Sequence, residues 1–343
     1  GGFHYPATCD KAIAEGKADI IYAARAYISN NDYGQLVLEG RDDDIVPCLR
    51  CNKCHGRGAN DPFVSVCSVN PRIGLEQKVA RMQVPTKGGK RVAIIGGGPV
   101  AMRCAMYLQD RGHTPVIYEK GPQLGGAIIH ADYAEFKWPL RDFKNFLIHQ
   151  MDKRGIAVHL NTEATPEMIK AENYDVVIAA TGANPMVLPI PGADPEKLFF
   201  AQETFAHPEK LGENVVVIGG GEVGADFRHP QQGAVGVEIG IYLSRKGHKA
   251  SVLEMRDRLA ADSTAIHYYS MLEEAWEAEP NFTGITGARV AAIKDGAVEY
   301  IDKDGNTQSV PADSVVMSAG MRPNKDLALS FYGCAKEFYM IGD

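Results

Sequence analysis

The chain of 343 residues is long enough for two or three domains at about 150 residues each, which excludes a single small fold unit. Its 45% hydrophobic and 23% charged residues are typical of a globular protein and exclude collagen-like, low-complexity and wholly disordered chains. The net charge of −7, with Lys and Arg scattered along the chain, argues against a nucleic-acid partner, which would require clustered cations.

The first residues, Gly1–Asp10, lack the basic start and apolar core of a signal peptide. The longest apolar runs, such as Tyr174–Ala180 and Val215–Ile218, fall far below the roughly 20 residues that cross a bilayer. The sequence therefore predicts a cytoplasmic protein without a membrane partner.

Four of the seven cysteines lie within residues 48–67, with the spacing C-x2-C-x2-C-x12-C. An odd total without a secretion signal disfavours disulfides and favours metal ligation. Three thiolates at three-residue intervals and a more distant fourth are typical of a loop around an iron–sulfur cluster. Zinc, which more often binds two separated C-x2-C pairs, is the alternative, and Cys9, Cys104 and Cys334 are expected to pack as small apolar residues. The predicted ligands are Cys48, Cys51, Cys54 and Cys67.

A glycine-rich turn follows the predicted strand Arg91–Ile95 and opens a helix that runs to about Arg111. The turn, Gly96–Ala101, has the form G-x-G-x-x-A, in which the first glycine allows the tight turn and the second lets the backbone approach a pyrophosphate. The next strand, Pro115–Glu119, ends in an acid suited to a ribose diol. The predicted contacts of this first finger are Gly96, Gly98, Ala101 and Glu119.

The same pattern recurs after the predicted strand Asn214–Ile218, as Gly219–Gly224 and later Ser251–Glu254. A lone finger is weak evidence, but two copies in a shared register predict two similar dinucleotide-binding domains in tandem. The predicted contacts of the second finger are Gly219, Gly221, Gly224 and Glu254.

The second copy carries a twelve-residue insertion, Ala225–Gly236, expected to loop out before the next helix. Without it the two copies align, and Tyr107 falls on Tyr242. Because the insertion ends in another Gly-Ala-Val-Gly, Gly233 and Gly236 are alternatives to the second and third glycines of the motif.

Each predicted domain closes with a strand, Tyr174–Gly182 in the first and Asp313–Gly320 in the second. The cysteine run, both fingers, the Ala-Thr-Gly strand end and the final Ile-Gly-Asp together resemble the NADH:flavin oxidoreductases of the 2,4-dienoyl-CoA reductase and old yellow enzyme-like family. The resemblance implies an α/β fold in which the end of a (β/α)8 barrel is followed by two Rossmann-like dinucleotide-binding domains, the NAD(P)H domain being inserted in the FAD domain. The implied bounds are 1–45 for the remnant of the FMN-binding barrel, 46–86 for the iron–sulfur segment, 87–187 and 318–343 for a truncated FAD-binding domain, and 188–317 for the NAD(P)H-binding domain.

Within that family, Gly1–Phe3 resembles the phosphate loop after the seventh barrel strand, and Ala18–Arg25 resembles the eighth strand. Position 24 is Ala where the family usually has Gly. A complete barrel takes about 250 residues, so the chain is expected to be a fragment, and the catalytic residues are unknown and expected upstream. The resemblance implies FMN contacts at Gly2, Ala24 and Arg25, and further cofactor contacts at Gly126, Thr181, Gly182, Gly342 and Asp343.

The resemblance also implies an activity: electrons pass from NAD(P)H through FAD and a 4Fe-4S cluster to FMN, which reduces the C=C bond of an α,β-unsaturated carbonyl or enoyl-CoA substrate. Glu254 favours NADH over NADPH, because its carboxylate would repel a 2′-phosphate, although Arg256 weakens this inference. An amine dehydrogenase relative, an electron-input module like the small subunit of glutamate synthase, and a non-catalytic fragment are the alternatives. The partner is expected to be a small-molecule substrate, and assembly into a homo-oligomer is left open.

Overall fold

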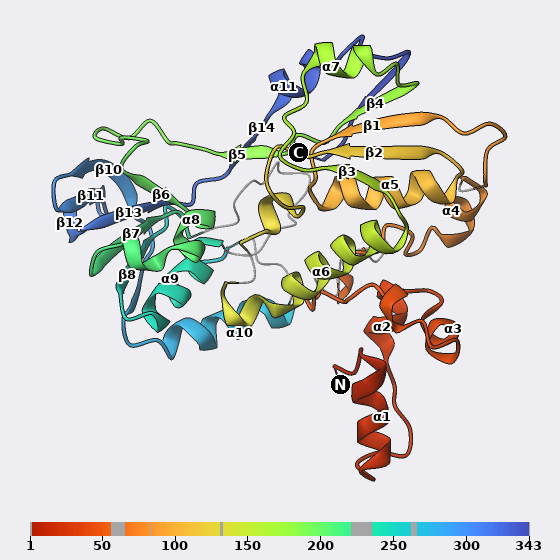
Figure 1. Ribbon diagram of the computed structural model, residues 1–343. Coiled ribbons are helices and arrows are strands. Elements are labelled where there is room, and N and C mark those ends of the chain that lie inside the picture. The colour runs from red at the N-terminus through yellow and green to blue at the C-terminus, as the bar shows by residue number, and fades with distance from the viewer. Residues whose placement is uncertain are drawn as a thin grey trace. The chain divides into compact units, whose positions relative to one another are not determined.

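The computed structural model of the chain describes residues 2–55, 66–82, 84–130, 133–220, 235–261 and 266–342. Its contacts divide the chain into two compact units (Figure 1). The first unit comprises Gly1–Cys54, Pro62–Gly182 and Asn324–Asp343, and the second comprises His55–Asp61 and Ala183–Pro323. The second unit therefore interrupts the first.

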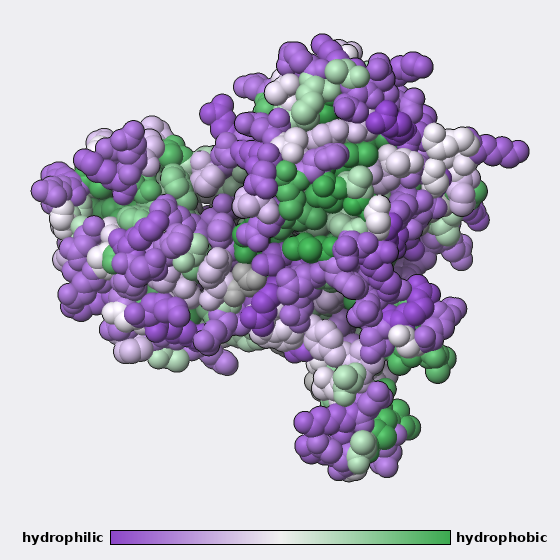
Figure 2. Space-filling view, in the orientation of Figure 1, coloured by the Kyte–Doolittle hydropathy of each residue, from purple (hydrophilic) through white to green (hydrophobic). Residues whose placement is uncertain are grey.

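Short helices and turns form the N-terminal part of the first unit. Its small core is made of Ala26, Tyr33, Leu36 and Ile45. Figure 2 shows hydrophobic side chains on the surface of this part, where Leu38 is 91% exposed. The elements are α1 (Pro6–Ala14), α2 (Ala24–Ser29), α3 (Tyr33–Leu38), the 3₁₀ turns η1 (Asp42–Asp44) and η2 (Lys53–His55), and α4 (Glu76–Met82).

A five-stranded parallel sheet forms the centre of the first unit, in the order β15-β4-β1-β2-β3. Its central strands β1 (Arg91–Ile95) and β4 (Val176–Ala179) are almost wholly buried, which explains their continuous runs of Val, Ile and Ala. The other elements are α5 (Pro99–Asp110), β2 (Thr114–Tyr118), η3 (Gly126–Ile128), η4 (Glu135–Lys137), α6 (Trp138–Lys153), β3 (Ala157–His159), α7 (Pro166–Ala171), α11 (Lys325–Ser330) and β15 (Glu337–Met340).

The second unit repeats this design, with a five-stranded parallel sheet in the order β6-β13-β7-β8-β9. An antiparallel sheet, β10-β11-β12, is added to it, and β5 pairs with β14 where the chain enters and leaves the unit. The elements are β5 (Ala183–Pro185), β6 (Leu198–Phe200), α8 (Ala201–Ala206), η5 (Pro208–Lys210), β7 (Asn214–Ile218), α9 (Val235–Arg245), β8 (Lys249–Leu253), α10 (Ile266–Glu277), β9 (Phe282–Ile285), β10 (Arg289–Lys294), β11 (Ala297–Ile301), β12 (Thr307–Pro311), β13 (Ser314–Met317) and β14 (Met321–Pro323).

The internal repeat extends to hydrogen bonds. The helix after each finger ends in a glycine with positive φ, 86° at Gly112 and 93° at Gly247. The residue that follows donates its backbone N–H to a leucine carbonyl at 3.0 Å in both copies, to Leu108 in the first and Leu243 in the second. The α/β fold with two dinucleotide-binding units, one inserted in the other, is thus confirmed.

The structure corrects the expected strand at Ala18–Arg25. Ala24 and Arg25 begin helix α2, and residues 18–23 belong to no strand. A strand is held by a hydrogen-bonded neighbour, and within the described ranges no strand pairs with this segment. A search of the described helices for a segment of sufficient length and hydropathy to span a bilayer found none.

Candidate functional site

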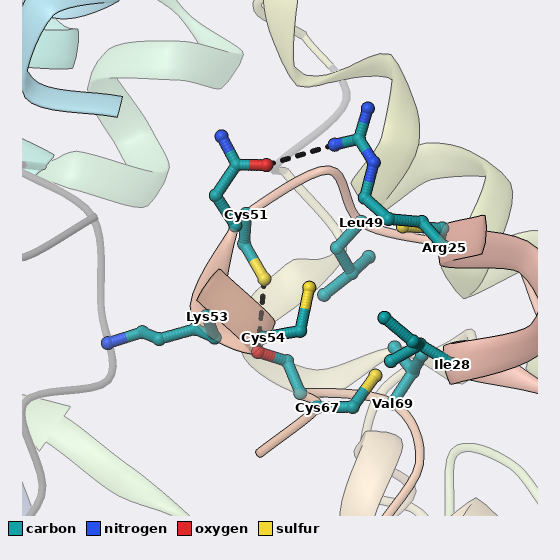
Figure 3. A pocket seen from close by; sticks show the side chains of 11 residues that line it. Arg25, Ile28, Leu49, Cys51, Lys53, Cys54, Cys67 and Val69 are labelled. Carbon is teal, nitrogen blue, oxygen red and sulfur yellow. Dashed lines mark hydrogen bonds between the residues drawn. The ribbon is translucent and has the colours of Figure 1, made fainter. Parts of the chain in front are cut away.

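Four cysteines line one pocket in the first unit, as their spacing predicts (Figure 3). Cys48, Cys51 and Cys54 come from one loop, and Cys67 comes from a segment further along the chain. In Figure 3 the sulfur atoms of the three labelled cysteines face a common space. The wall also contains the apolar side chains Ile28, Leu49 and Val69, and the four cysteines are partly buried.

The loop turns through two residues in the left-handed region, Arg50 with φ of 54° and Asn52 with φ of 56°. Asn adopts this conformation readily, whereas Arg does so at some cost. These two residues lie on either side of Cys51. The tight turns allow three cysteines that are close in sequence to line the same pocket.

Cys48 takes part in two hydrogen bonds, and burial raises the pKa values of two other cysteines, Cys54 and Cys67. The Arg50 N–H donates to Sγ of Cys48 at 3.4 Å, and the Cys48 N–H donates to Nε2 of the buried His4 at 3.1 Å. Burial raises the pKa of the Cys54 thiol, and the three neighbouring cysteines raise it further. Burial likewise raises the pKa of Cys67. A metal centre at this site would have to displace the thiol protons.

Four thiols can serve as ligands of a zinc ion or of an iron–sulfur cluster. Within the part of the chain that the structure describes, no three His, Cys, Asp or Glu side chains are placed to hold a single metal ion. A tetrahedral zinc ion with bonds of about 2.3 Å would need its sulfur ligands roughly 3.8 Å apart. A group of several iron atoms takes thiolates that are more widely spaced. The spacing of the sulfur atoms would therefore distinguish the two kinds of centre.

Both segments predicted to contact FMN lie against the cysteine loop. Arg25 Nη1 donates to Oδ1 of Asn52 at 2.9 Å. Arg50 Nη2 donates to the carbonyl oxygen of Gly2 at 3.1 Å. Gly2 has φ of 87°, which glycine adopts without strain, and Ala24 is exposed at the start of α2. The structure thus brings Gly2 and Arg25 together with the cysteines.

The first finger is a tight glycine turn with one open position. Gly96 has φ of 108°, and a Cβ at this residue would lie 2.3 Å from the carbonyl oxygen of Ala180. A Cβ at Gly98, by contrast, would meet only Cα of Gly126, at 4.0 Å, so the backbone there is open. Ala101 is fully buried in α5. The turn is therefore closed on the sheet side and accessible above Gly98.

Glu119 lies next to this turn and is hydrogen-bonded to it. Its carboxylate accepts hydrogen bonds from the backbone N–H groups of Gly97 and Gly121, both at 2.7 Å. An ionised carboxylate has about four lone-pair sites, so two remain for the hydroxyl groups of a ribose. The acid is held in place by the finger itself.

Two further chain segments reach the same edge of the sheet. Gly182 has φ of 63° and accepts a hydrogen bond from the Asn324 N–H at 2.9 Å, and the side-chain amide of Asn324 donates to the carbonyl oxygen of Thr181 at 3.1 Å. A Cβ at Gly342 would lie 3.8 Å from Val100 at the start of α5. Thr181 and Gly342 thus lie near the finger, as predicted, whereas Asp343 is outside the described residues.

The described part of the second finger, at Gly219, Gly220 and Glu254, has the same geometry as the first. Gly219 has φ of 102°, and its Cβ would lie 2.3 Å from the carbonyl oxygen of Ser318. Glu254, 7% exposed, accepts from the N–H groups of Gly220 and Arg256, both at 2.9 Å. The two remaining predicted contacts, Gly221 and Gly224, and the alternative Gly233 lie outside the described residues.

Gly236 lies within the structure and touches the turn directly. A Cβ at this residue of α9 would fall 1.7 Å from the carbonyl oxygen of Gly219, so only glycine fits. Counted back from the matched pair Tyr107 and Tyr242, Gly236 corresponds to Ala101, which is fully buried in α5. This supports the alternative in which the end of the insertion supplies the third glycine of the finger.

Sequence reasoning missed several residues of the site. Gly97 and Gly220 fall on a variable position of the motif, although both fingers contain three consecutive glycines, which was the available signal. Asn52 lies between Cys51 and Cys54, where the cysteine spacing gives no information about the other residues, and Asn324 lies in a segment without a motif. His4 gave no signal, because its contact with Cys48 joins residues far apart in the chain.

Comparisons with known protein families agree with the two fingers. Residues 94–145 match the NAD(P)-binding Rossmann-like domain, and residues 167–228 and 232–337 match the pyridine nucleotide-disulphide oxidoreductases. These matches cover parts of both dinucleotide-binding units and define the class as a pyridine-nucleotide oxidoreductase.

Individual relatives narrow this class. The chain is 32% identical over 329 residues to an NADH oxidase of Thermoanaerobacter brockii, which covers 94% of this chain and 48% of the relative. It is 29% identical over 330 residues to a cinnamate reductase of Clostridium sporogenes, covering 95% of this chain and 47% of the relative. A structure of 2-naphthoyl-CoA reductase with 2-naphthoyl-CoA superposes with a TM-score of 0.90 and 31% identity, over 99% of this chain and 50% of that chain.

The chain belongs to the NADH:flavin oxidoreductases of the 2,4-dienoyl-CoA reductase and old yellow enzyme-like family and corresponds to their C-terminal part. It spans about half the length of the relatives that it matches. The family assignment made from the motifs is confirmed.

Proposed function

We propose that this chain forms the electron-input part of a NAD(P)H-dependent flavin oxidoreductase that reduces a C=C bond in a small α,β-unsaturated carbonyl or enoyl-CoA substrate. The observation that carries the proposal is the presence, in one chain, of two dinucleotide fingers of equal design and a pocket lined by four cysteines. Two relatives support the substrate class, because cinnamate is an α,β-unsaturated carboxylate and 2-naphthoyl-CoA is a conjugated thioester.

In this proposal the first finger holds FAD. The open backbone at Gly98 faces the pyrophosphate, and the two free lone pairs of Glu119 accept from the adenosine ribose. When bound, FAD accepts a hydride as an electron pair and releases electrons singly. The further contacts are Gly96, Ala101, Gly126, Thr181, Gly182, Gly342 and Asp343.

The second finger holds the nicotinamide nucleotide, and we infer that NADH is preferred. Glu254 is buried and already anchored to Gly220, so it cannot swing away from a 2′-phosphate. Its negative charge therefore repels NADPH and accepts from the ribose diol of NADH. Steady-state kinetics should give the larger kcat/KM for NADH, and a value more than ten times larger for NADPH would contradict the inference.

The cysteine pocket holds a 4Fe-4S cluster, with Cys48, Cys51, Cys54 and Cys67 as ligands. When bound, such a cluster supplies one-electron transfer. Ile28, Leu49 and Val69 form an apolar part of the wall beside the cysteines. Gly2 and Arg25, which contact the cysteine loop, form part of the FMN phosphate site, with Ala24 beside them.

The proposal is tested on the full-length protein, purified without oxygen. We expect iron, acid-labile sulfide, FMN and FAD, and oxidation of NADH that depends on cinnamate or an enoyl-CoA. Replacing Cys51 with Ser should abolish substrate reduction but leave the reduction of ferricyanide by NADH, which needs only the dinucleotide-binding units. The matched control Cys9→Ser changes a cysteine of α1 outside the pocket and should keep both activities.

Three outcomes would contradict the proposal. One is protein without iron and sulfide, and another is full NADH-driven substrate reduction by the C51S variant. The third is flavin reduction by an amine with no oxidation of NADH, which would favour the amine dehydrogenase alternative instead.

A further inference from the structure

The cysteine loop and Arg25 are joined by a side-chain hydrogen bond whose role the proposed electron path does not explain. Arg25 Nη1 donates to Oδ1 of Asn52, and both residues line the pocket that Figure 3 shows. Asn52 is only 9% exposed, and its φ of 56° is one that Asn and Asp tolerate better than other side chains. Asn52 thus has a fixed orientation, and its oxygen fixes one nitrogen of Arg25.

A second bond from the same loop reaches the other predicted FMN segment. Arg50 donates to the carbonyl oxygen of Gly2, and its guanidinium lies 4.7 Å from the centre of the Trp138 ring. The two polar residues of the loop that adopt left-handed conformations therefore each contact one of the segments predicted to hold the FMN phosphate.

Both guanidinium groups have neutral partners. Arg25 bonds an amide, and Arg50 bonds a carbonyl oxygen and faces an aromatic ring. Over the described ranges of the chain, no ion pair includes either arginine. Arg25 is bonded to Asn52, which lies two residues after Arg50, so both guanidinium groups belong to the surroundings of the cysteine loop. Two uncompensated guanidinium groups at one place suit a phosphate, which accepts charge-assisted bonds from Arg.

We propose that Asn52 is a positioning residue for the phosphate of FMN, holding the Arg25 guanidinium through a neutral acceptor so that its charge and remaining N–H groups face the phosphate. The inference rests on the proposed function, since it requires FMN at this place. Arg has five donors, and Asn52 takes one of them. A carboxylate in place of the amide would hold Arg25 equally well but would cancel its charge and repel the phosphate. The amide is therefore the suitable partner.

If Asn52 acts through its neutral charge, replacing it with Asp should leave stability intact while weakening phosphate binding. A residue with only a structural role would not separate these two effects. In the Asn52→Asp variant the bond to Arg25 becomes an ion pair, so thermal stability should be unchanged or higher. The affinity for FMN should nevertheless fall about tenfold or more, as expected for a weakened bond between charged groups. Riboflavin, which has no phosphate, should bind as before.

The experiment measures dissociation constants of FMN and riboflavin by flavin fluorescence, using the full-length protein from which flavin has been removed. The wild type is expected to bind FMN more tightly than riboflavin, and N52D should reduce this ratio by about tenfold. Asn52→Gly, which keeps the left-handed backbone and removes the amide, should reduce it less. The control Ser68→Ala removes a hydroxyl that contacts Cys51 at 3.2 Å without touching Arg25, and it should leave the ratio unchanged.

The possible failures are distinguishable. A wild type that prefers FMN, together with unchanged ratios in both Asn52 variants, would overturn the role of Asn52 and leave the proposed function standing. A ratio that falls as far in S68A as in N52D would also overturn it, because any disturbance of the loop would then suffice. A wild-type protein that binds FMN no better than riboflavin would overturn the phosphate site at Arg25 and the inference with it.

Discussion

Glu119 accepts a hydrogen bond from the backbone N–H of Gly97, 22 positions earlier, at 2.7 Å. A Cβ at Gly97 would lie 2.9 Å from the Glu119 carboxylate and 2.6 Å from Leu124, so a side chain there would force both of these to move. The second copy has the same pair, Glu254 and Gly220, at 2.9 Å. In each unit the acid at the end of the second strand thus anchors the glycine turn at the end of the first.

This relationship predicts paired effects of substituting each acid. Glu119→Gln places an amide against the N–H of Gly97 or Gly121 and removes the charge, so FAD affinity should fall by about 1.5–3 kcal/mol, or roughly 10–100-fold. NADH binding should be nearly unchanged. Glu254→Gln should do the reverse, raising KM for NADH while FAD content stays at the wild-type level. Flavin quantification and steady-state kinetics measure the two effects.

Each variant of this pair serves as the control for the other. Equal losses of FAD in both variants would show that the acids act through general stability rather than through their own nucleotides. Circular dichroism at room temperature should show both variants folded, because the amide oxygen of Gln can still accept one of the two backbone hydrogen bonds.

Substitutions at Gly96 and Gly98 should affect different properties: the stability of the protein at Gly96 and the affinity for FAD alone at Gly98. Gly96→Ala introduces a Cβ 2.3 Å from a backbone oxygen in a left-handed conformation, so thermal stability should fall, by about 1–3 kcal/mol in the free energy of unfolding. Gly98→Ala meets nothing closer than 4.0 Å and has φ of −75°, so stability should be unchanged. FAD affinity should still fall, because the methyl group occupies the space predicted for the pyrophosphate.

Urea unfolding and FAD titration of both variants check this difference. Unchanged FAD affinity in G98A would place the pyrophosphate elsewhere. A stable G96A variant would mean that the turn can relax away from Ala180.

These examples show what the sequence could and could not predict. The strands β1, β2, β4, β7, β8 and β13, the helices α5 and α9 and the tight turn at Gly96 follow from local patterns, because glycine spacing and apolar runs act over a few residues. The pairing of Glu119 with Gly97 could not be predicted, since it depends on how two parallel strands are placed side by side. Ala18–Arg25 was wrongly expected to be a strand for a related reason: a strand depends on its neighbours, and residue types alone do not supply them.

Gly236 provides a prediction about the insertion. Gly236→Ala places a Cβ 1.7 Å from the carbonyl oxygen of Gly219, so α9 would have to move away from the turn. We expect a loss of about 1–3 kcal/mol in the unfolding free energy and a higher KM for NADH. The control in the same helix is Ser244→Ala, whose buried hydroxyl has no hydrogen-bond partner in the described structure and whose removal should cost little. If G236A has the stability and the KM for NADH of the wild type, the third glycine of the finger is Gly224 instead.

Asp44 makes the acid stability of the first unit predictable. Burial alone would raise the pKa of Asp44, but hydrogen bonds from Lys153, Gln150 and Arg41 outweigh burial and lower the pKa from 3.8 to about 2. The Lys153 ammonium and the Gln150 amide belong to α6, so the carboxylate ties the N-terminal part of the unit to this helix. A lowered pKa means that the folded state favours the ionised form more than the unfolded state does.

The stability from Asp44 is therefore fully present above about pH 4 and is lost as the pH falls through about 2. Asp44→Asn should reduce the unfolding free energy by roughly 1–2 kcal/mol at pH 6, a value discounted for partial exposure of the carboxylate to solvent. The gap between wild type and variant should close as the pH is lowered from 4 to 2, which urea unfolding at several pH values measures. Asp43→Asn, at a side chain that is 74% exposed, is the control and should change stability little. A difference between wild type and D44N that stays constant from pH 6 to pH 2 would mean that the carboxylate charge contributes nothing and that the amide fails for steric reasons.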